Sequence, residues 1–172
     1  MLSKKLHEAL NAQINGEFWS SYLYLSMSLD AEAKGLKGFA NWFYVQFLEE
    51  QDHARILMNY IISRDAAVTL LPIEKVQTSW ASPLEMYKEA LLQEKKVTTS
   101  INNLAEIAVA DKDHASANML IWFVNEQVEE EESARDMITA CEAVEGNKFG
   151  LYMLDKEAAS RTYEKASPLT KE

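Results

Sequence analysis

The chain has 172 residues, a length that predicts one domain with a substantial hydrophobic core. It carries 17 Lys and Arg against 27 Asp and Glu, and the net charge of −10 argues against nucleic acid and anionic membranes as partners. The single cysteine, Cys141, excludes a disulfide framework and a cysteine-based zinc or iron–sulfur site within the chain, which fits a reducing cytosol.

The N-terminal part of the chain predicts two long helices joined by a short turn. Apolar residues recur at steps of three or four from about Ser3 to Ala33, and again from about Leu36 to Arg64. Gly35 lies between the two segments, where it is placed to end the first helix. Because the turn is short, we expect the two helices to lie side by side in opposite directions.

A second pair of helices is predicted after a long connection. Residues 66–82 lack clear periodicity and contain Pro72, which predicts a crossover along the bundle. Ser82 and Pro83 are placed to open a third helix, over about 83–110. A tight break at 111–113, with Asp113 as a candidate cap, leads to a fourth helix over about 114–144.

The C-terminal part predicts a short fifth helix. Gly146 and Gly150 bracket a second break, and the helix is expected over about 151–161, within the range 150–162. The tail from Thr162 is polar and is expected to be loosely held. The predicted fold is therefore all-α, with a single domain over 1–172, a four-helix bundle over about 3–145, a long crossover and a fifth helix.

Six polar residues near the middle of the four long helices share the faces that the apolar residues define. They are Glu17, Glu50, His53, Glu94, Gln127 and Glu130. The same spacing occurs in both halves of the chain. Glu50 follows Glu17 by 33 positions and Gln127 follows Glu94 by 33. His53 and Glu130 each lie three positions further on. A charge left unpaired in the interior costs several kcal/mol or more, so buried carboxylates are paired or bind a metal. Incidental buried polar residues are the alternative, but the repeated spacing favours a binding site.

The donor set indicates which metal would bind. Carboxylate oxygens with one imidazole suit iron or manganese, while a set without thiolates is less suited to tight structural zinc. Two metal ions that share a carboxylate can pass two electrons to one dioxygen molecule. The sequence therefore predicts a site for a pair of iron or manganese ions inside the bundle.

These motifs resemble those of bacterial non-haem ferritin, and the resemblance covers nearly the whole chain. The matching segments are Asn15-Gly16-Glu17, Tyr24, Glu49-Glu50-x-x-His53-Ala54, Glu94, and Asn125-Glu126-Gln127-x-Glu129-Glu130-Glu131. Trp122 also matches an aromatic residue found close to the site in that family. The resemblance implies a ferritin-like bundle with the short fifth helix of that fold.

The resemblance also implies a role for each site residue. Glu17, Glu50 and His53 would hold one iron, and Glu50, Glu94 and Glu130 would hold the second. Gln127 would lie beside these ligands, and Tyr24 would hydrogen-bond the site and could donate an electron, although core packing explains Tyr24 equally well. A third iron would take four glutamates: Glu49, Glu126, Glu129 and Glu130. Without such a site, the run 129–132 would form a solvated helix face.

The function implied by the resemblance is cytoplasmic iron storage. The protein would oxidise Fe(II) with dioxygen or hydrogen peroxide and store ferric mineral inside a hollow shell of twenty-four identical chains. No haem is expected, because Gln51 stands where bacterioferritin has its haem-ligating Met, and Gln127-x-x-Glu130 replaces the second Glu-x-x-His of that family. The acidic positions of many animal ferritin channels fall on Ala117 and Leu120, which leaves the route of iron uptake open.

Related and unrelated alternatives remain at this point. The cysteine-rich iron module of rubrerythrins is excluded by the single cysteine, and mini-ferritins lack the fifth helix. A di-iron carboxylate enzyme acting on an organic substrate, or a helical interaction module without metal, would not form a shell. The longest apolar run, Met119–Val124, is far too short to span a membrane, and no secretory signal is predicted.

Overall fold

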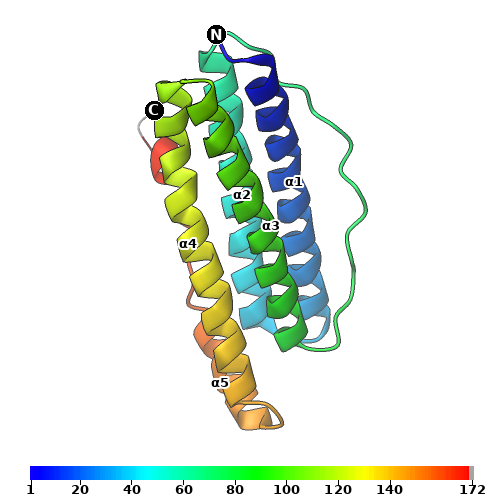
Figure 1. Cartoon of the computed structure of the whole chain (residues 1–172). Helices are drawn as coiled ribbons and strands as arrows, with labels where there is room; N and C mark the ends of the chain where they lie inside the picture. Colours follow the sequence, from blue (N-terminus) through cyan, green and yellow to red (C-terminus); the bar gives the residue numbers. More distant parts are fainter. Residues whose placement is uncertain (171–172) are drawn as a thin grey trace.

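The computed structural model describes residues 1–170 and contains, within that range, five α-helices and one short 3-10 helix. Four long helices form a bundle, and the fifth packs at one end of it (Figure 1). Their bounds are α1 Lys4–Ala33, α2 Lys37–Ser63, α3 Pro83–Ala110, α4 His114–Ala143, α5 Lys148–Ala158 and η1 Ser167–Leu169. The all-α prediction is confirmed.

Two tight turns set the antiparallel pairs α1–α2 and α3–α4. Gly35 ends α1 at a φ of 76°, and the Leu36 N–H donates back to the Ala31 carbonyl at 3.0 Å. Lys112 takes the same left-handed conformation at a φ of 55° in the second turn. There the predicted cap Asp113 accepts a hydrogen bond from the Ser116 N–H at 3.1 Å. Both turns therefore reverse the chain within three residues.

The segment between α2 and α3 runs along the whole bundle, as the sequence predicted (Figure 1). Two side chains of this crossover, Val76 and Trp80, are buried in the core. The Trp80 N–H donates to Asp30 Oδ2 at 3.1 Å, and Lys34 pairs with the same carboxylate at 2.5 Å. These contacts fix the end of the crossover against α1, just before Ser82 caps α3 with a 3.3 Å bond from Glu85 N–H.

Helix α5 begins three residues before the predicted start, so Gly150 lies inside the helix and does not bracket a break. Asn147 causes this earlier start, because its side chain accepts the Gly150 N–H at 3.0 Å and caps the helix. About two turns later along α5, Asp155 Oδ1 accepts the N–H groups of Gly38 and Phe39 at 2.9 and 3.0 Å. A side chain of α5 therefore caps the first turn of α2.

The segment after α5 is docked on the bundle, so the prediction of a loosely held tail from Thr162 is wrong for the described residues. The chain turns back and runs along α2 toward the N-terminal end of the bundle, where η1 lies (Figure 1). Tyr163 and Ala166 both donate to Asp52 Oδ2, at 2.7 and 3.0 Å. Leu169 is 2% exposed and joins the hydrophobic core. The apolar Leu169 and the buried carboxylate of Asp52 hold this segment despite its polar composition.

The hydrophobic core is divided into two clusters along the bundle axis. One cluster contains Tyr24, Phe43 and Tyr87 and lies toward α5. The other contains Ile14, Ala54 and Phe123 and lies toward the N-terminal end of α1. On each long helix, buried polar residues occupy the turns between the two clusters. The fold therefore places a polar layer in the middle of an apolar bundle.

Candidate metal centre

The polar layer contains the six residues that repeat at equal spacing in the sequence. Exposed fractions are 0% for Glu17, 1% for Glu50 and Glu94, 2% for His53, 3% for Gln127 and 6% for Glu130. One side chain comes from α1, two from α2, one from α3 and two from α4. Four carboxyls therefore share one interior layer, where unpaired charge is unfavourable unless a cation binds.

Glu17, Glu50 and His53 form the tightest group of donor atoms. Each offers one atom, and these three atoms all lie within 4.8 Å of one another. His53 Nδ1 is 3.4 Å from Glu50 Oε2, because the three-residue step on α2 places both side chains on one face. The buried oxygens Glu17 Oε2 and Glu50 Oε2 have no hydrogen-bond partner within residues 1–170. Such unsatisfied oxygens are free to bind a cation.

Glu94 is held by hydrogen bonds from two sides. Gln127 Nε2 donates to Glu94 Oε2 at 3.1 Å and to the Glu94 carbonyl at 3.2 Å. The Tyr24 hydroxyl donates to Glu94 Oε1, and its ring stacks on Phe43 with centroids 6.4 Å apart. Tyr24 therefore contacts a carboxylate of the layer and also belongs to the core.

Glu130 projects from α4 toward α2. Its Oε2 accepts a hydrogen bond from Gln46 Nε2 at 2.7 Å. One atom each of Glu130, Glu126 and His53 forms a second group within 4.8 Å, and His53 Nε2 lies 4.0 Å from Glu126 Oε1. The His53 ring meets Trp122 edge-on at 5.5 Å, which restricts its rotation. The layer thus continues from the buried centre toward the surface through Glu126.

Burial and mutual repulsion change the acidity of these carboxyls. Desolvation raises the pKa of Glu17 to about 8, with the Glu50 carboxyl adding to the effect. Desolvation, followed by repulsion from Glu130, raises the pKa of Glu94 to about 8. The pKa of Glu50 is also raised, by burial first and then by Glu94 and Glu130. The metal-free layer therefore retains protons at neutral pH, and a cation that binds there must displace them.

The three outer glutamates of the implied third iron site differ in exposure. Glu49 and Glu126 are partly buried, while Glu129 is exposed. Burial raises the pKa of Glu49 to about 7, and the pKa of Glu126 is also raised, mainly by burial. Glu49 Oε2 pairs with Arg161 Nη2 at 2.5 Å. A basic side chain thus already contacts one of the predicted ligands.

Sequence reasoning assigned no role to three side chains that contact the layer. Gln13 Nε2 donates to Glu17 Oε1 at 2.9 Å, and Gln46 holds Glu130. Both glutamines lie on the apolar stripes of their helices, one turn before a site glutamate. That position could have indicated that they contact the layer. Arg161 gave no such signal, because it lies outside the four periodic segments.

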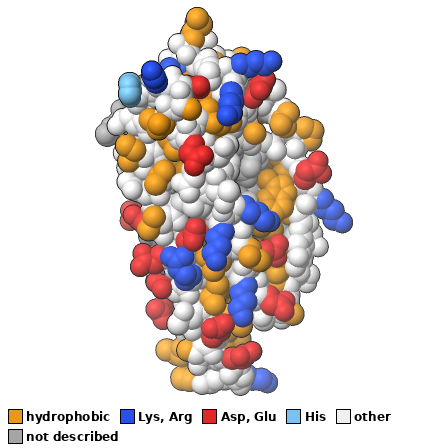
Figure 2. Space-filling view, in the orientation of Figure 1, with side chains coloured by type: hydrophobic (Ala, Val, Ile, Leu, Met, Phe, Trp, Pro, Cys, Tyr) orange, Lys and Arg blue, Asp and Glu red, His pale blue; other side chains and the backbone are white. Residues whose placement is uncertain are grey.

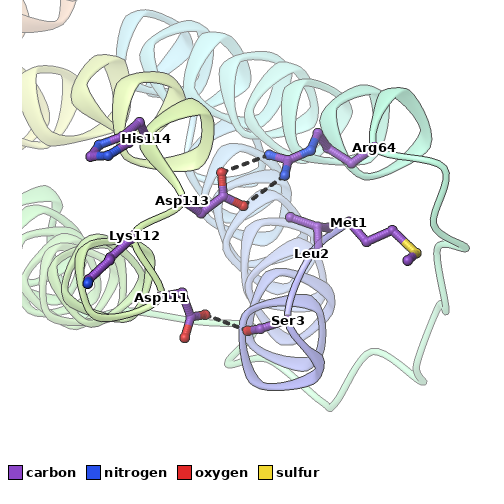
Figure 3. A pocket seen from close by; sticks show the side chains of 8 residues that line it. All are labelled: Met1, Leu2, Ser3, Arg64, Asp111, Lys112, Asp113 and His114. Carbon is purple, nitrogen blue, oxygen red and sulfur yellow. Dashed lines mark hydrogen bonds and ion pairs between the residues drawn. The ribbon is translucent and has the colours of Figure 1, made fainter.

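A separate polar pocket lies where the start of α1 meets the α3–α4 turn (Figure 3). Arg64 forms two hydrogen bonds with the Asp113 carboxylate, at 2.8 and 3.1 Å, and Ser3 donates to Asp111 at 2.5 Å. These side chains pair with one another across the pocket (Figure 3). The paired side chains therefore hold the ends of the helices together. None of the residues that line this pocket belongs to the carboxylate layer.

Comparison with known proteins identifies the family. The family model of the ferritin-like domain matches residues 7–144, which include α2, α3 and α4, all but the first three residues of α1, and every residue of the polar layer.

The chain belongs to the ferritin family.

A bacterial non-heme ferritin of Bacteroides fragilis is 38% identical over 161 residues, covering 94% of this chain and 100% of the relative. A bacterial non-heme ferritin of Staphylococcus aureus is also 38% identical, over 95% of this chain and 99% of its own. Among solved structures, an open pore ferritin from the archaeon Archaeoglobus fulgidus superposes with a TM-score of 0.93 at 42% identity, covering 94% of this chain and 100% of that one.

Membership of the ferritin family supports a role in iron storage, and the donor set of the layer fits iron. Carboxylates with one imidazole are ligands that iron accepts readily, and no cysteine lies among the donors of the two candidate groups.

None of the described helices is both long enough and apolar enough to cross a membrane. Exposed hydrophobic side chains gather at the α5 end of the bundle (Figure 2), including Phe149, Tyr152 and Met153.

Proposed function

We propose that the protein oxidises Fe(II) at the carboxylate layer and stores the ferric product inside a hollow shell of twenty-four chains in the cytoplasm. The observation that carries this proposal is the burial of four carboxyls and one imidazole in a single layer, with two carboxylate oxygens that lack a hydrogen-bond partner among the described residues. Such an arrangement is unfavourable without a cation and favourable with one.

The positions of the donors suggest how two iron ions would be shared. Glu17 and His53 would hold one ion, and Glu94 and Glu130 would hold the other. Glu50 would be shared by the two ions, because Glu17, Glu94 and Glu130 all act on its buried carboxyl. Gln127 and Gln46 would fix the orientation of Glu94 and Glu130 through the hydrogen bonds they donate.

The redox balance follows from the pair of ions. Two Fe(II) ions supply two electrons, which with two protons reduce dioxygen to hydrogen peroxide, or reduce hydrogen peroxide to two waters. Iron binding would displace the protons that Glu17 and Glu94 hold at neutral pH, and this release would supply protons for either reduction. Tyr24, whose hydroxyl donates to Glu94, would supply a further electron if dioxygen is reduced beyond hydrogen peroxide.

The test combines oxidation kinetics with native mass. Replacing Glu50 by Ala removes the shared ligand, and replacing His53 by Ala removes the nitrogen donor, so each variant should lose rapid Fe(II) oxidation, followed as ferric absorbance after aerobic mixing. Glu106→Ala is the matched control, because Glu106 is an exposed glutamate of α3. A wild-type rate in Glu50→Ala would refute the proposed centre.

Native mass tests the storage part of the proposal. A particle near the mass of twenty-four chains, in the wild type and in both centre variants, supports a shell. A wild-type dimer would instead favour a di-iron enzyme that acts on an organic substrate.

A further inference from the structure

The segment from Arg161 to Leu169 lies against α2 beside the metal centre. Asn41 Nδ2 donates to the Arg161 carbonyl at 2.8 Å, and Asp52 accepts from Tyr163 and Ala166 further along the helix. These contacts bracket Gln46 and Glu49, which lie between Asn41 and Asp52 along α2. The segment is therefore held in a fixed register over the outer edge of the carboxylate layer.

The side chain of Arg161 reaches two residues of this part of α2 at once. Arg161 Nη2 donates to Gln46 Oε1 and to Glu49 Oε2, both at 2.5 Å. Its guanidinium carbon lies 4.3 Å from the centroid of the Trp42 ring, a stacking contact that orients the planar group. The charged group is thus positioned by an aromatic surface and two oxygens.

Gln46 connects Arg161 to the buried centre. Its oxygen accepts from Arg161, which leaves its nitrogen to donate to Glu130 Oε2 at 2.7 Å. The orientation of the Gln46 amide is therefore fixed from both ends. Through this amide the arginine also influences a carboxylate of the polar layer.

We propose that Arg161 competes with a third iron for the Glu49 carboxylate. The guanidinium occupies this carboxylate in the metal-free protein, and the third iron must displace it to bind there. This proposal rests on the proposed function and on the third iron that the resemblance to bacterial non-haem ferritin implies. A cation and a guanidinium compete for the same carboxylate oxygen because both need its negative charge. The acidic Glu126 and Glu130 and the imidazole of His53 also act on Glu49, and Arg161 supplies a permanent positive charge in direct contact with this carboxylate.

The docking of α5 determines where Arg161 lies. Gly38 approaches α5 so closely that a Cβ atom at this position would lie 1.5 Å from the Asp155 carbonyl oxygen. Asp155 caps α2 in return, and α5 ends at Ala158, three residues before the arginine. The distance from this contact to Glu49 is spanned by a short, hydrogen-bonded stretch of chain. The docking of α5 therefore places the positive charge of Arg161 beside Glu49.

The test is an anaerobic calorimetric titration of the assembled, metal-free protein with Fe(II) at pH 8. In Arg161→Gln, the competing charge is absent, so the dissociation constant of the third Fe(II) should fall about fivefold, the size expected for a partly exposed ion pair. The two ions of the buried layer should bind as in the wild type. Arg161→Lys retains a positive charge and should restore a third-ion affinity near that of the wild type.

Two controls separate competition from other effects of the substitution. Lys88→Gln removes one positive charge from an exposed ion pair with Glu142, at 3.1 Å, and should leave all three constants unchanged. Tyr163→Phe removes the bond to Asp52 and loosens the segment without removing the arginine. This variant should also bind the third ion as the wild type does.

The outcomes distinguish this inference from the function on which it rests. A wild type that binds no Fe(II) tightly would refute the proposed centre itself. Two tight ions in every variant, with the third ion unchanged in Arg161→Gln, would overturn the role of Arg161 and leave the centre intact. An equal gain in Tyr163→Phe would overturn it as well, because segment docking would then be the cause.

Discussion

Gln46 on α2 donates a 2.7 Å hydrogen bond to Glu130 on α4, and both side chains are buried. This bond joins two helices at the level of the polar layer and fixes the direction in which the Glu130 carboxylate faces. Residues that orient a metal ligand in this way affect both metal affinity and turnover.

Replacing Gln46 by Leu should slow Fe(II) oxidation about tenfold, because Glu130 loses the donor that orients it. Stopped-flow measurement of ferric absorbance gives the rate. Gln51→Leu is the matched control on the same helix, since Gln51 donates to the Phe47 carbonyl of its own helix at 3.2 Å. Equal rates in both variants would show that Glu130 is oriented without Gln46.

Glu17 predicts how the stability of the metal-free protein depends on pH. Because burial raises its pKa from 4.5 to about 8, the folded state holds the proton more tightly than the unfolded chain does. The stabilisation from this group is complete below about pH 4.5 and is lost as the pH rises through about 8. Metal-free protein should therefore lose stability across this range.

Glu17→Gln removes this titration while keeping the side-chain volume and the bond with Gln13. At pH 8 the metal-free variant should be more stable than the wild type by about 1 kcal/mol or more, which corresponds to a rise in Tm of about 2–4 °C. Near pH 5 the difference should become small. Calorimetry at both pH values tests this expectation, with the exposed Glu106→Gln as control. A lower Tm for Glu17→Gln at pH 8 would mean that the carboxylate is satisfied without metal.

Tyr24 and Tyr87 are both fully buried, but only Tyr24 has a hydroxyl partner among the described residues. Tyr24→Phe should slow Fe(II) oxidation severalfold, because Glu94 loses one of its donors. Tyr87→Phe removes a hydroxyl without a partner and should leave the rate unchanged while stability stays equal or rises by about 1 kcal/mol. Matched kinetics for the two variants would assign Tyr24 to packing alone.

Gly38 and Gly16 provide a matched pair of glycine substitutions within helices. Gly38→Ala would force a Cβ atom into the Asp155 carbonyl and should detach α5, with a loss of about 2 kcal/mol or more in stability. At Gly16 the nearest atom would be Gln13 Nε2 at 3.9 Å, so Gly16→Ala should stabilise α1 by up to about 1 kcal/mol. Hydrogen exchange of α5 amides reports the detachment. Protection equal to that of the wild type in Gly38→Ala would contradict it.

Helical periodicity was sufficient to predict the long helices and to place Glu17, Glu50, His53, Glu94, Gln127 and Glu130 on inward-facing stripes. The helical period determines which side chains share a face of one helix. The equal spacing in the two antiparallel pairs places the polar residues of all four helices at the same height in the bundle. The same reasoning could not separate Glu49 and Glu126 from the exposed Glu129, because these residues lie at the edges of their stripes.

The C-terminal region could not be predicted in this way. The start of α5 depends on the Asn147 cap, which overrides the expectation based on Gly150. The position of Arg161 depends on contacts with α2 that are more than a hundred residues apart in the chain, and no periodic pattern encodes them. A polar composition suggested a free tail, whereas one buried leucine and one buried aspartate are enough to dock it.

The two turns of the bundle have equal lengths, residues 34–36 and 111–113, and each contains one residue with positive φ. Glu17 and Glu50 lie at nearly equal distances on either side of the first turn, and Glu94 and Gln127 do so around the second. One added residue in either turn would shift the following helix by about 1.5 Å along its axis and about 100° around it. The lengths of the two turns therefore determine whether the ligands of paired helices lie at the same level. Insertions and deletions should be less tolerated in these turns than in the long crossover.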